Sequence, residues 1–129
     1  MGDKKEVIEL SLPVNAAYVS AARLTASSIA NRLGFDIDEM EDVKAAVSEA
    51  CILMIKLAPT DVVKHFKVIF DPGAESLTVR ILADGIDLTQ DEEGMSLMMI
   101  RALMDNVEID RSNSCMELCM VKKHQRLFL

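Results

Sequence analysis

Hydrophobic residues recur along the chain with two different periods, and each period predicts a different kind of element. Apolar and polar residues alternate over Glu6–Leu12, which predicts a half-buried strand that ends at Pro13. Over Ala16–Leu33 the apolar residues recur at helical spacing, and Gly34 predicts the end of that helix. The first part of the chain therefore predicts a strand followed by an amphipathic helix.

A second helix is expected to begin at a cap formed by Asp36 or Asp38 and to run to about Leu57. The turn Asp71–Ala74 predicts a hairpin. The remaining strands and the third helix are predicted at Phe66–Phe70, Ser76–Leu82, Met95–Asp105, Val107–Asp110 and Cys115–Val121. The order β-α-α-β-β-α-β-β predicts one domain over residues 1–129 with an α/β (α+β) fold. We expect a two-layer sandwich with the helices on one face of a mixed, mostly antiparallel sheet.

Half of the residues are hydrophobic, but the chain has only four Phe, one Tyr and no Trp, so the core must be aliphatic. Nine methionines contribute to it, and Met95, Met98, Met99 and Met104 fall in one segment. Thioether side chains fill cores and also form adaptable binding surfaces. We expect this segment to fill the core, with a partner-binding surface as the alternative.

The net charge of −7 and the lack of a basic patch predict neither a nucleic-acid nor a membrane partner. No apolar run is long enough to cross a bilayer, and the charged N-terminus does not look like a secretion signal. Three cysteines, an odd number, fit a reduced cytoplasmic protein. Cys115 and Cys119 would lie about 13 Å apart on one strand, too far to share a metal ion. The basic stretch 122–126 is expected to be a solvated tail.

The sequence offers few candidate catalytic residues. It has no P-loop, no Gly-x-Gly-x-x-Gly fingerprint, no catalytic triad spacing and no paired metal ligands, so no metal site is predicted. His65 and His124 are expected to be satisfied or solvated. Glu49 is the one carboxylate in the apolar helical stretch Val43–Ile55. It is either held at a site or solvated at the edge of the buried face.

Three segments, Leu12–Val19, Ala46–Cys51 and Ile100–Ile109, resemble the bacterial anti-sigma factor serine kinases. Those proteins are histidine-kinase-like ATPases with the Bergerat nucleotide-binding fold, and their element order resembles the predicted one across nearly the whole chain. The resemblance implies ATP and Mg²⁺ as cofactors, and a sigma factor or an anti-anti-sigma antagonist as partner. It also implies a homodimer, usually formed through the first strand and the sheet edge.

The family's motif Glu-x-x-x-Asn, on the second helix, is only half preserved. Its Glu acts as a general base or positions water, and the matching residue is Glu49. Its Asn holds Mg²⁺ against the nucleotide phosphates, but the matching residue is Leu53. Leucine offers no lone pair to a cation that demands oxygen ligands. Glu49 is then expected to be a relic of the catalytic role or a polar contact at the rim of the cavity.

The family's second motif, Asp-x-Gly-x-Gly, contains the Asp that reads the adenine amino group. The Asp position falls on Ile81 and the first Gly on Ala83, whereas Gly85 is retained. Asp84 could serve as the Asp only at the cost of the glycine pattern. The resemblance therefore implies that adenine recognition is weakened.

The phosphate-binding motif Gly-x-Gly-Leu retains Gly94 but carries Ser96 at its second glycine. A position that is often basic in the family is Glu92, within the acidic run Asp91–Glu93, which we expect to be a solvated loop. The Gly-Thr pair that supports the adenine-reading Asp falls on Cys115–Met116. Together these replacements predict a disabled nucleotide site without cofactors.

Three functions remain open. The favoured one is a binding module that occludes a sigma factor or binds an antagonist, with impaired ATP binding and kinase activity. The alternative is an active serine kinase that uses Glu49, ATP and Mg²⁺ to phosphorylate an antagonist domain. The third is a small-molecule or structural role, in which the former nucleotide cavity is filled by its own side chains or accepts an apolar ligand. That cavity would be lined by Leu53, Ile81, Met95, Met98 and Met116.

Overall fold

A computed structural model describes residues 6–58, 64–85 and 94–124. Its elements are β1 (Ile8–Pro13), a 3₁₀ turn (Ala16–Tyr18), α1 (Val19–Arg32), α2 (Ile37–Leu57), β2 (His65–Pro72), β3 (Ser76–Asp84), α3 (Gly94–Leu103), β4 (Asn106–Ser112) and β5 (Cys115–Lys123). The predicted order of strands and helices is confirmed.

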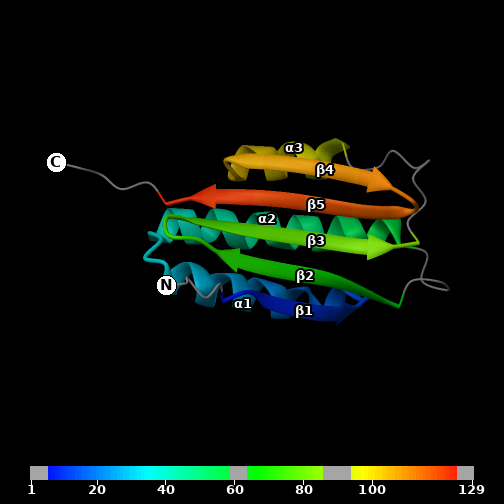
Figure 1. The fold of residues 1–129 in the computed structure, drawn as a ribbon, viewed down its shortest axis with the longest axis horizontal. Coiled ribbons are helices and arrows are strands. Elements are labelled where there is room, and N and C mark those ends of the chain that lie inside the picture. The colour runs from blue at the N-terminus through cyan, green and yellow to red at the C-terminus, as the bar shows by residue number, and fades with distance from the viewer. Residues whose placement is uncertain (1–5, 59–63, 86–93, 125–129) are drawn as a thin grey trace, which may run out of the picture.

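The five strands form one sheet in the order β1-β2-β3-β5-β4, and the three helices cover one of its faces (Figure 1). The two-layer sandwich is therefore confirmed. Every hydrogen-bonded pair is antiparallel, which is stricter than the mixed sheet that we expected. The α3 crossover does return the chain so that β3 and β4 run in the same direction. However, β5 lies between these two strands, and the parallel pair never forms.

Alternation along the central strands gives the sheet a buried face toward the helices and an outer face. The buried residues of β3 and β5 are at most 4% exposed, and they are Leu77, Val79, Ile81, Ala83, Met116, Leu118 and Met120. Most of the residues between them are half-buried. The core is mostly aliphatic, as the composition predicts, and its aromatic side chains are Phe35 and, on β2, Phe66 and Phe70.

The helix boundaries follow from local capping. Asp36, one of the two predicted caps, accepts the N–H of Glu39 at 2.7 Å, and the Glu39 carboxylate accepts the N–H of Asp36 at 2.8 Å. This reciprocal pair is a capping box. The helix expected over Ala16–Leu33 is divided into a 3₁₀ turn and α1, because Asn15 accepts the N–H of Ala17 and caps the short turn.

The methionine segment fills the core only in part, so the expectation from composition is wrong for most of it. Met104 is 6% exposed, but Met95, Met98 and Met99 are 78%, 73% and 46% exposed. The reason is geometric: α3 meets the rest of the molecule along the face that carries the buried Ile100. A helix in a two-layer sandwich buries one face, and these three methionines lie on the other side of α3 and on its flank.

Replacing Asp36 with Ala should lower the free energy of unfolding by about 1 kcal/mol, because the substitution removes the side-chain cap of α2. Urea denaturation followed by circular dichroism measures this loss. Asp38→Ala is the matched control, since Asp38 is an exposed acidic residue in the same turn. Its loss should be about half as large or less, limited to the interaction with the helix dipole. Equal losses would contradict the capping role of Asp36.

Candidate functional site

The candidate site begins with two side chains on α2, the central helix of the layer (Figure 1). Glu49 and Leu53 lie one helical turn apart and project from the same side of α2. Glu49 is half-buried, whereas Leu53 is fully buried, with 0% exposure. α2 therefore places the Glu49 carboxylate at the rim of the core and the Leu53 side chain in the interior.

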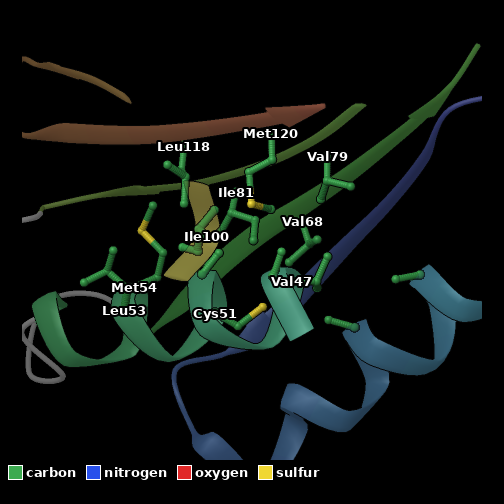
Figure 2. Close-up of a cluster of buried hydrophobic side chains, with 14 of the residues drawn as sticks. Val47, Cys51, Leu53, Met54, Val68, Val79, Ile81, Ile100, Leu118 and Met120 are labelled. Carbon is green, nitrogen blue, oxygen red and sulfur yellow. The ribbon is translucent and has the colours of Figure 1, made fainter. Parts of the chain in front are cut away.

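Leu53 is part of the hydrophobic core that joins the helices to the sheet. Figure 2 shows it with Met54 of α2, Ile81 of β3, Ile100 of α3 and Leu118 of β5 in one cluster of buried side chains. All five are 0% exposed, and none carries an oxygen or nitrogen atom on its side chain. These five residues come from four different elements, α2, β3, α3 and β5, and belong to one buried core.

The positions matched to the adenine-reading motif lie on β3 next to β5. In the strand register Ile81 is paired with Leu118, and Ala83 with Met116. These four residues are at most 4% exposed and face the helices. Asp84 is exposed and lies on the opposite face, because successive side chains of a strand alternate. The carboxylate of Asp84 is therefore directed away from the interior that contains Leu53.

The outer face of the sheet carries two of the three free thiols. Burial raises the pKa of the Cys115 thiol, and a hydrogen bond with the Asp84 carboxylate raises it further. Burial, with the nearby Glu117 carboxylate, also raises the pKa of Cys119. Raised pKa values keep both thiols protonated near neutral pH, where they are poor nucleophiles. Among the described residues, no three His, Cys, Asp or Glu side chains are placed to hold a metal ion.

The glycines matched to the phosphate motifs differ in what their backbones require. Gly85 has a φ of +76°, a left-handed conformation that favours glycine. Gly94 begins α3, and a Cβ added there would meet no atom within 4 Å. Ser96, in the first turn of α3, is half-buried. The acidic run Asp91–Glu93, including Glu92, lies outside the described residues.

The structure brings together four of the matched positions, Leu53, Ile81, Ala83 and Met116, in the buried core. This apolar interior does not fit Mg²⁺ and a nucleotide, because a hard cation requires oxygen ligands and an adenine amino group requires an acceptor. Among the matched positions that the structure describes, Glu49, at the rim, is the one that provides a carboxylate on the helix side.

Three of the five residues expected to line the cavity of the third function belong to the hydrophobic core. Leu53, Ile81 and Met116 are at most 1% exposed and pack within the core. Met95 and Met98 do not line this interior, because they project from the exposed side of α3. The sequence pattern could not separate the buried residues from the exposed methionines, since both groups lie in strongly apolar segments.

In the described part of the basic stretch at the C-terminal end, Lys122 and His124 are docked, not solvated, whereas Lys123 is exposed. The Lys122 side chain is 13% exposed and donates to Asp42 at 3.0 Å and to a backbone carbonyl of α3 at 2.7 Å. His124 is satisfied: its Nδ1 lies 2.8 Å from a Glu39 carboxylate oxygen, and its ring stacks on Phe35. These contacts join the end of β5 to the first turns of α2, far along the helix from Leu53. No local pattern could have indicated them, because Asp42 and Glu39 lie 80 and 85 residues away in the sequence.

The chain belongs to the histidine kinase-like ATPase domain family, whose model matches residues 12–122. It is 37% identical over 86 residues to the serine-protein kinase RsbW of Bacillus mycoides (strain KBAB4). It is 35% identical over 86 residues to the RsbW of Bacillus cereus (strain Q1). Each alignment covers 67% of this chain and 54% of the relative, so the chain spans about half the length of these curated relatives.

A solved structure supports the same fold. The crystal structure of the RsbU and RsbW domains of Rv1364c from Mycobacterium tuberculosis superposes with a TM-score of 0.77 and 16% identity. The match covers 94% of this chain and 33% of that chain. At this level of identity the likeness establishes the architecture. Over the described ranges 6–58, 64–85 and 94–124, none of the helices has the length and apolar character to cross a membrane.

Stability should decrease as the pH rises above about 9, because of Cys51. Burial raises the pKa of this thiol from 9.0 to about 12. Between these values the thiol ionises in the unfolded chain but stays neutral in the folded protein. The unfolded state then binds fewer protons, so the free energy of unfolding falls with rising pH.

Urea denaturation at pH values from 7 to 10.5 measures this dependence. Cys51→Val removes the thiol. Above pH 9 the free energy of unfolding of wild type should therefore fall more steeply than that of the variant. Cys115→Val is the control, because Cys115 is less buried and should contribute a smaller slope. A parallel decline in wild type and Cys51→Val would show that the thiol is not responsible.

Proposed function

We propose that this chain is an anti-sigma regulator that acts by binding, and that its ATP binding and kinase activity are impaired. Its partner is a sigma factor, an anti-anti-sigma antagonist, or both. The observation that carries the proposal is Leu53, fully buried at the position where the family places its metal-holding Asn. The fold and the relatives named RsbW support the regulatory role.

Leu53 supports impairment because its replacement is not a surface change. Transferring a cation into this cluster would require it to lose water ligands without gaining protein oxygens, which costs far more than a weak contact returns. Admitting a metal would also require the Leu53 side chain to leave the core. Removing a buried leucine side chain lowers stability by about 2–5 kcal/mol, because it leaves a cavity. The packing around Leu53 therefore opposes Mg²⁺ on two grounds.

The strand register supports impairment of adenine recognition as well. In the family the Thr of the last strand supports the adenine-reading Asp, and its counterpart here is Met116. Met116 is the direct partner of Ala83 on β3, whereas Ile81 is paired with Leu118. This pairing favours Ala83 as the counterpart of the Asp, with Gly85 as the first glycine. With Ile81 or Ala83 as the counterpart the position is buried and apolar, whereas the alternative, Asp84, is exposed on the outer face.

Glu49 is the residue that favours the alternative, an active kinase. It keeps the family's acidic residue and sits half-buried at the rim of the core, where a general base would be needed. A working kinase would then have to recruit an oxygen ligand for Mg²⁺ from elsewhere than Leu53. We assign Glu49 to the rim as a polar contact, and the active kinase remains the second candidate.

The proposed mechanism is occlusion. The helical layer and the sheet edge cover a surface of the partner, and no chemical step is required. A homodimer belongs to the same proposal, and the edge strand β1 is suited to it. β1 is paired with β2 on one side only within the described sheet, and the exposed fractions of Val7 and Ile8 beside this edge are 46% and 40%.

Millimolar Mg²⁺-ATP or Mg²⁺-ADP should leave the melting temperature of the protein unchanged. A nucleotide with micromolar affinity would add about 4 kcal/mol at that concentration, which a thermal shift detects easily. The RsbW of Bacillus cereus serves as the positive control. A Mg²⁺-dependent shift would overturn the impaired site and favour the kinase.

The protein should form a stable complex with a sigma factor or an antagonist-domain protein from the same genome. Purified pairs can be compared by size-exclusion chromatography with light scattering, which also reports the oligomeric state. Complex formation should be the same with and without Mg²⁺-ATP, because binding alone is required. Failure to bind any of these proteins would refute the regulatory function.

A further inference from the structure

The exposed side of α3 carries a regular apolar stripe. Met95, Met98, Met99 and Ala102 are spaced i, i+3, i+4 and i+7, which places them along one side of a helix. The three methionines are 78%, 73% and 46% exposed, and Ala102 is also exposed. We call these four residues the α3 methionine stripe.

The opposite side of α3 is apolar too, and it is already covered. Ile100 is 0% and Met104 6% exposed, and Leu97 packs against the core. A surface helix of a globular protein has one apolar side and one polar side, whereas a helix apolar on both sides is normally buried on both. The second apolar side of α3 therefore indicates that another element covers it in a complex.

The size of the stripe favours a single helix over a second copy of this chain. Two turns of exposed methionine offer a few hundred Å² of apolar surface, in the range of functional patches on monomers. A stable symmetric interface uses about 800 Å² on each partner. Unbranched thioether side chains adapt to different apolar surfaces, as on other surfaces that bind amphipathic helices.

The charge beside the stripe defines the polar chemistry of the partner. Arg101 is the one charged side chain of α3 and is exposed. Its guanidinium donates one N–H to the Val107 carbonyl at 3.2 Å, a contact that holds the group beside the helix. A guanidinium has five N–H donors and pairs best with a carboxylate.

We propose that the α3 methionine stripe docks the apolar face of an amphipathic helix from a partner protein, with a carboxylate at its rim opposite Arg101. The biological identity of that helix rests on the proposed function, because a sigma factor or antagonist would supply it. The docking surface itself rests on the exposure, spacing and charge of α3.

The test uses the full chain labelled with ¹³C at its methionine methyl groups and a synthetic helical peptide. The peptide carries Leu at i, i+3, i+4 and i+7 and Glu at the rim, and a second peptide carries Lys instead. The Glu peptide should cause saturable chemical-shift changes in the methyl signals of Met95, Met98 and Met99. It should bind at least fivefold more tightly than the Lys peptide. The buried Met54, Met116 and Met120 are internal controls and should not shift. Arg101→Gln should abolish the preference between the peptides.

Substitutions test whether peptide binding depends on the α3 methionine stripe or on exposed apolar side chains in general. The double variant Met95→Gln/Met98→Gln should weaken peptide binding at least tenfold. Leu24→Gln and Ile37→Gln change side chains of similar exposure, 70% and 77%, outside α3 and should change binding less than twofold. Because all four side chains are exposed, each variant should retain the wild-type melting temperature within a few degrees.

Several results would overturn the docking surface. They are the absence of saturable shifts, equal shifts of buried methionines, shifts produced only by anionic vesicles, or a concentration-dependent dimer that Met95→Gln/Met98→Gln abolishes. The partner complexes distinguish this proposal from the function. If wild type and the double variant bind a sigma factor or antagonist equally well, the docking surface is wrong and the regulatory function stands. If wild type binds neither protein but binds the Glu peptide as described, the function fails and the docking surface stands.

Discussion

Burial of α2 between the sheet and its two flanking helices is the constraint on which the rest of the structure depends. α2 contacts α1 and α3 on its sides and β3 and β5 beneath it. Its inward residues, among them Val47, Cys51 and Met54, are 0% exposed. A capping box begins the helix, and the docked end of β5 holds its first turns, so its rotation about its own axis is determined. That rotation places Leu53 in the interior and Glu49 at the rim.

The same constraint connects the site with the surface. The interior beside α2 contains Leu53, Ile81 and Met116, which are at most 1% exposed. The impaired nucleotide site that we propose follows from the apolar character of this interior. What the domain retains is a rigid helical layer whose outer helix, α3, presents apolar side chains to solvent. These exposed side chains are the surface on which the proposed recognition of a partner rests.

Sequence reasoning recovered the architecture because each element has its own period and its own punctuation. The alternation in β3 and β5, and the cap at Asp36, are local properties that the chain carries wherever it folds. The replaced motif position, Leu53, was equally visible because it depends on spacing within one helix. Three features were not local. The fate of the methionines in α3, the docking of Lys122 and His124, and the insertion of β5 between β3 and β4 depend on which neighbours arrive.

The sequence by itself determined the elements, their order and the aliphatic character of the core, and it predicts the loss of polar ligands at the family's motif positions. These follow from periodicity and residue chemistry, which require no knowledge of partners in space. Tertiary structure decided which of the apolar residues are interior. Leu53 is buried because it lies on the side of α2 that belongs to the core, whereas Met98 is exposed because α3 has only one side facing the core. Apolar periodicity indicates that a side chain favours burial, but only the arrangement of the layers decides whether a neighbouring element covers it.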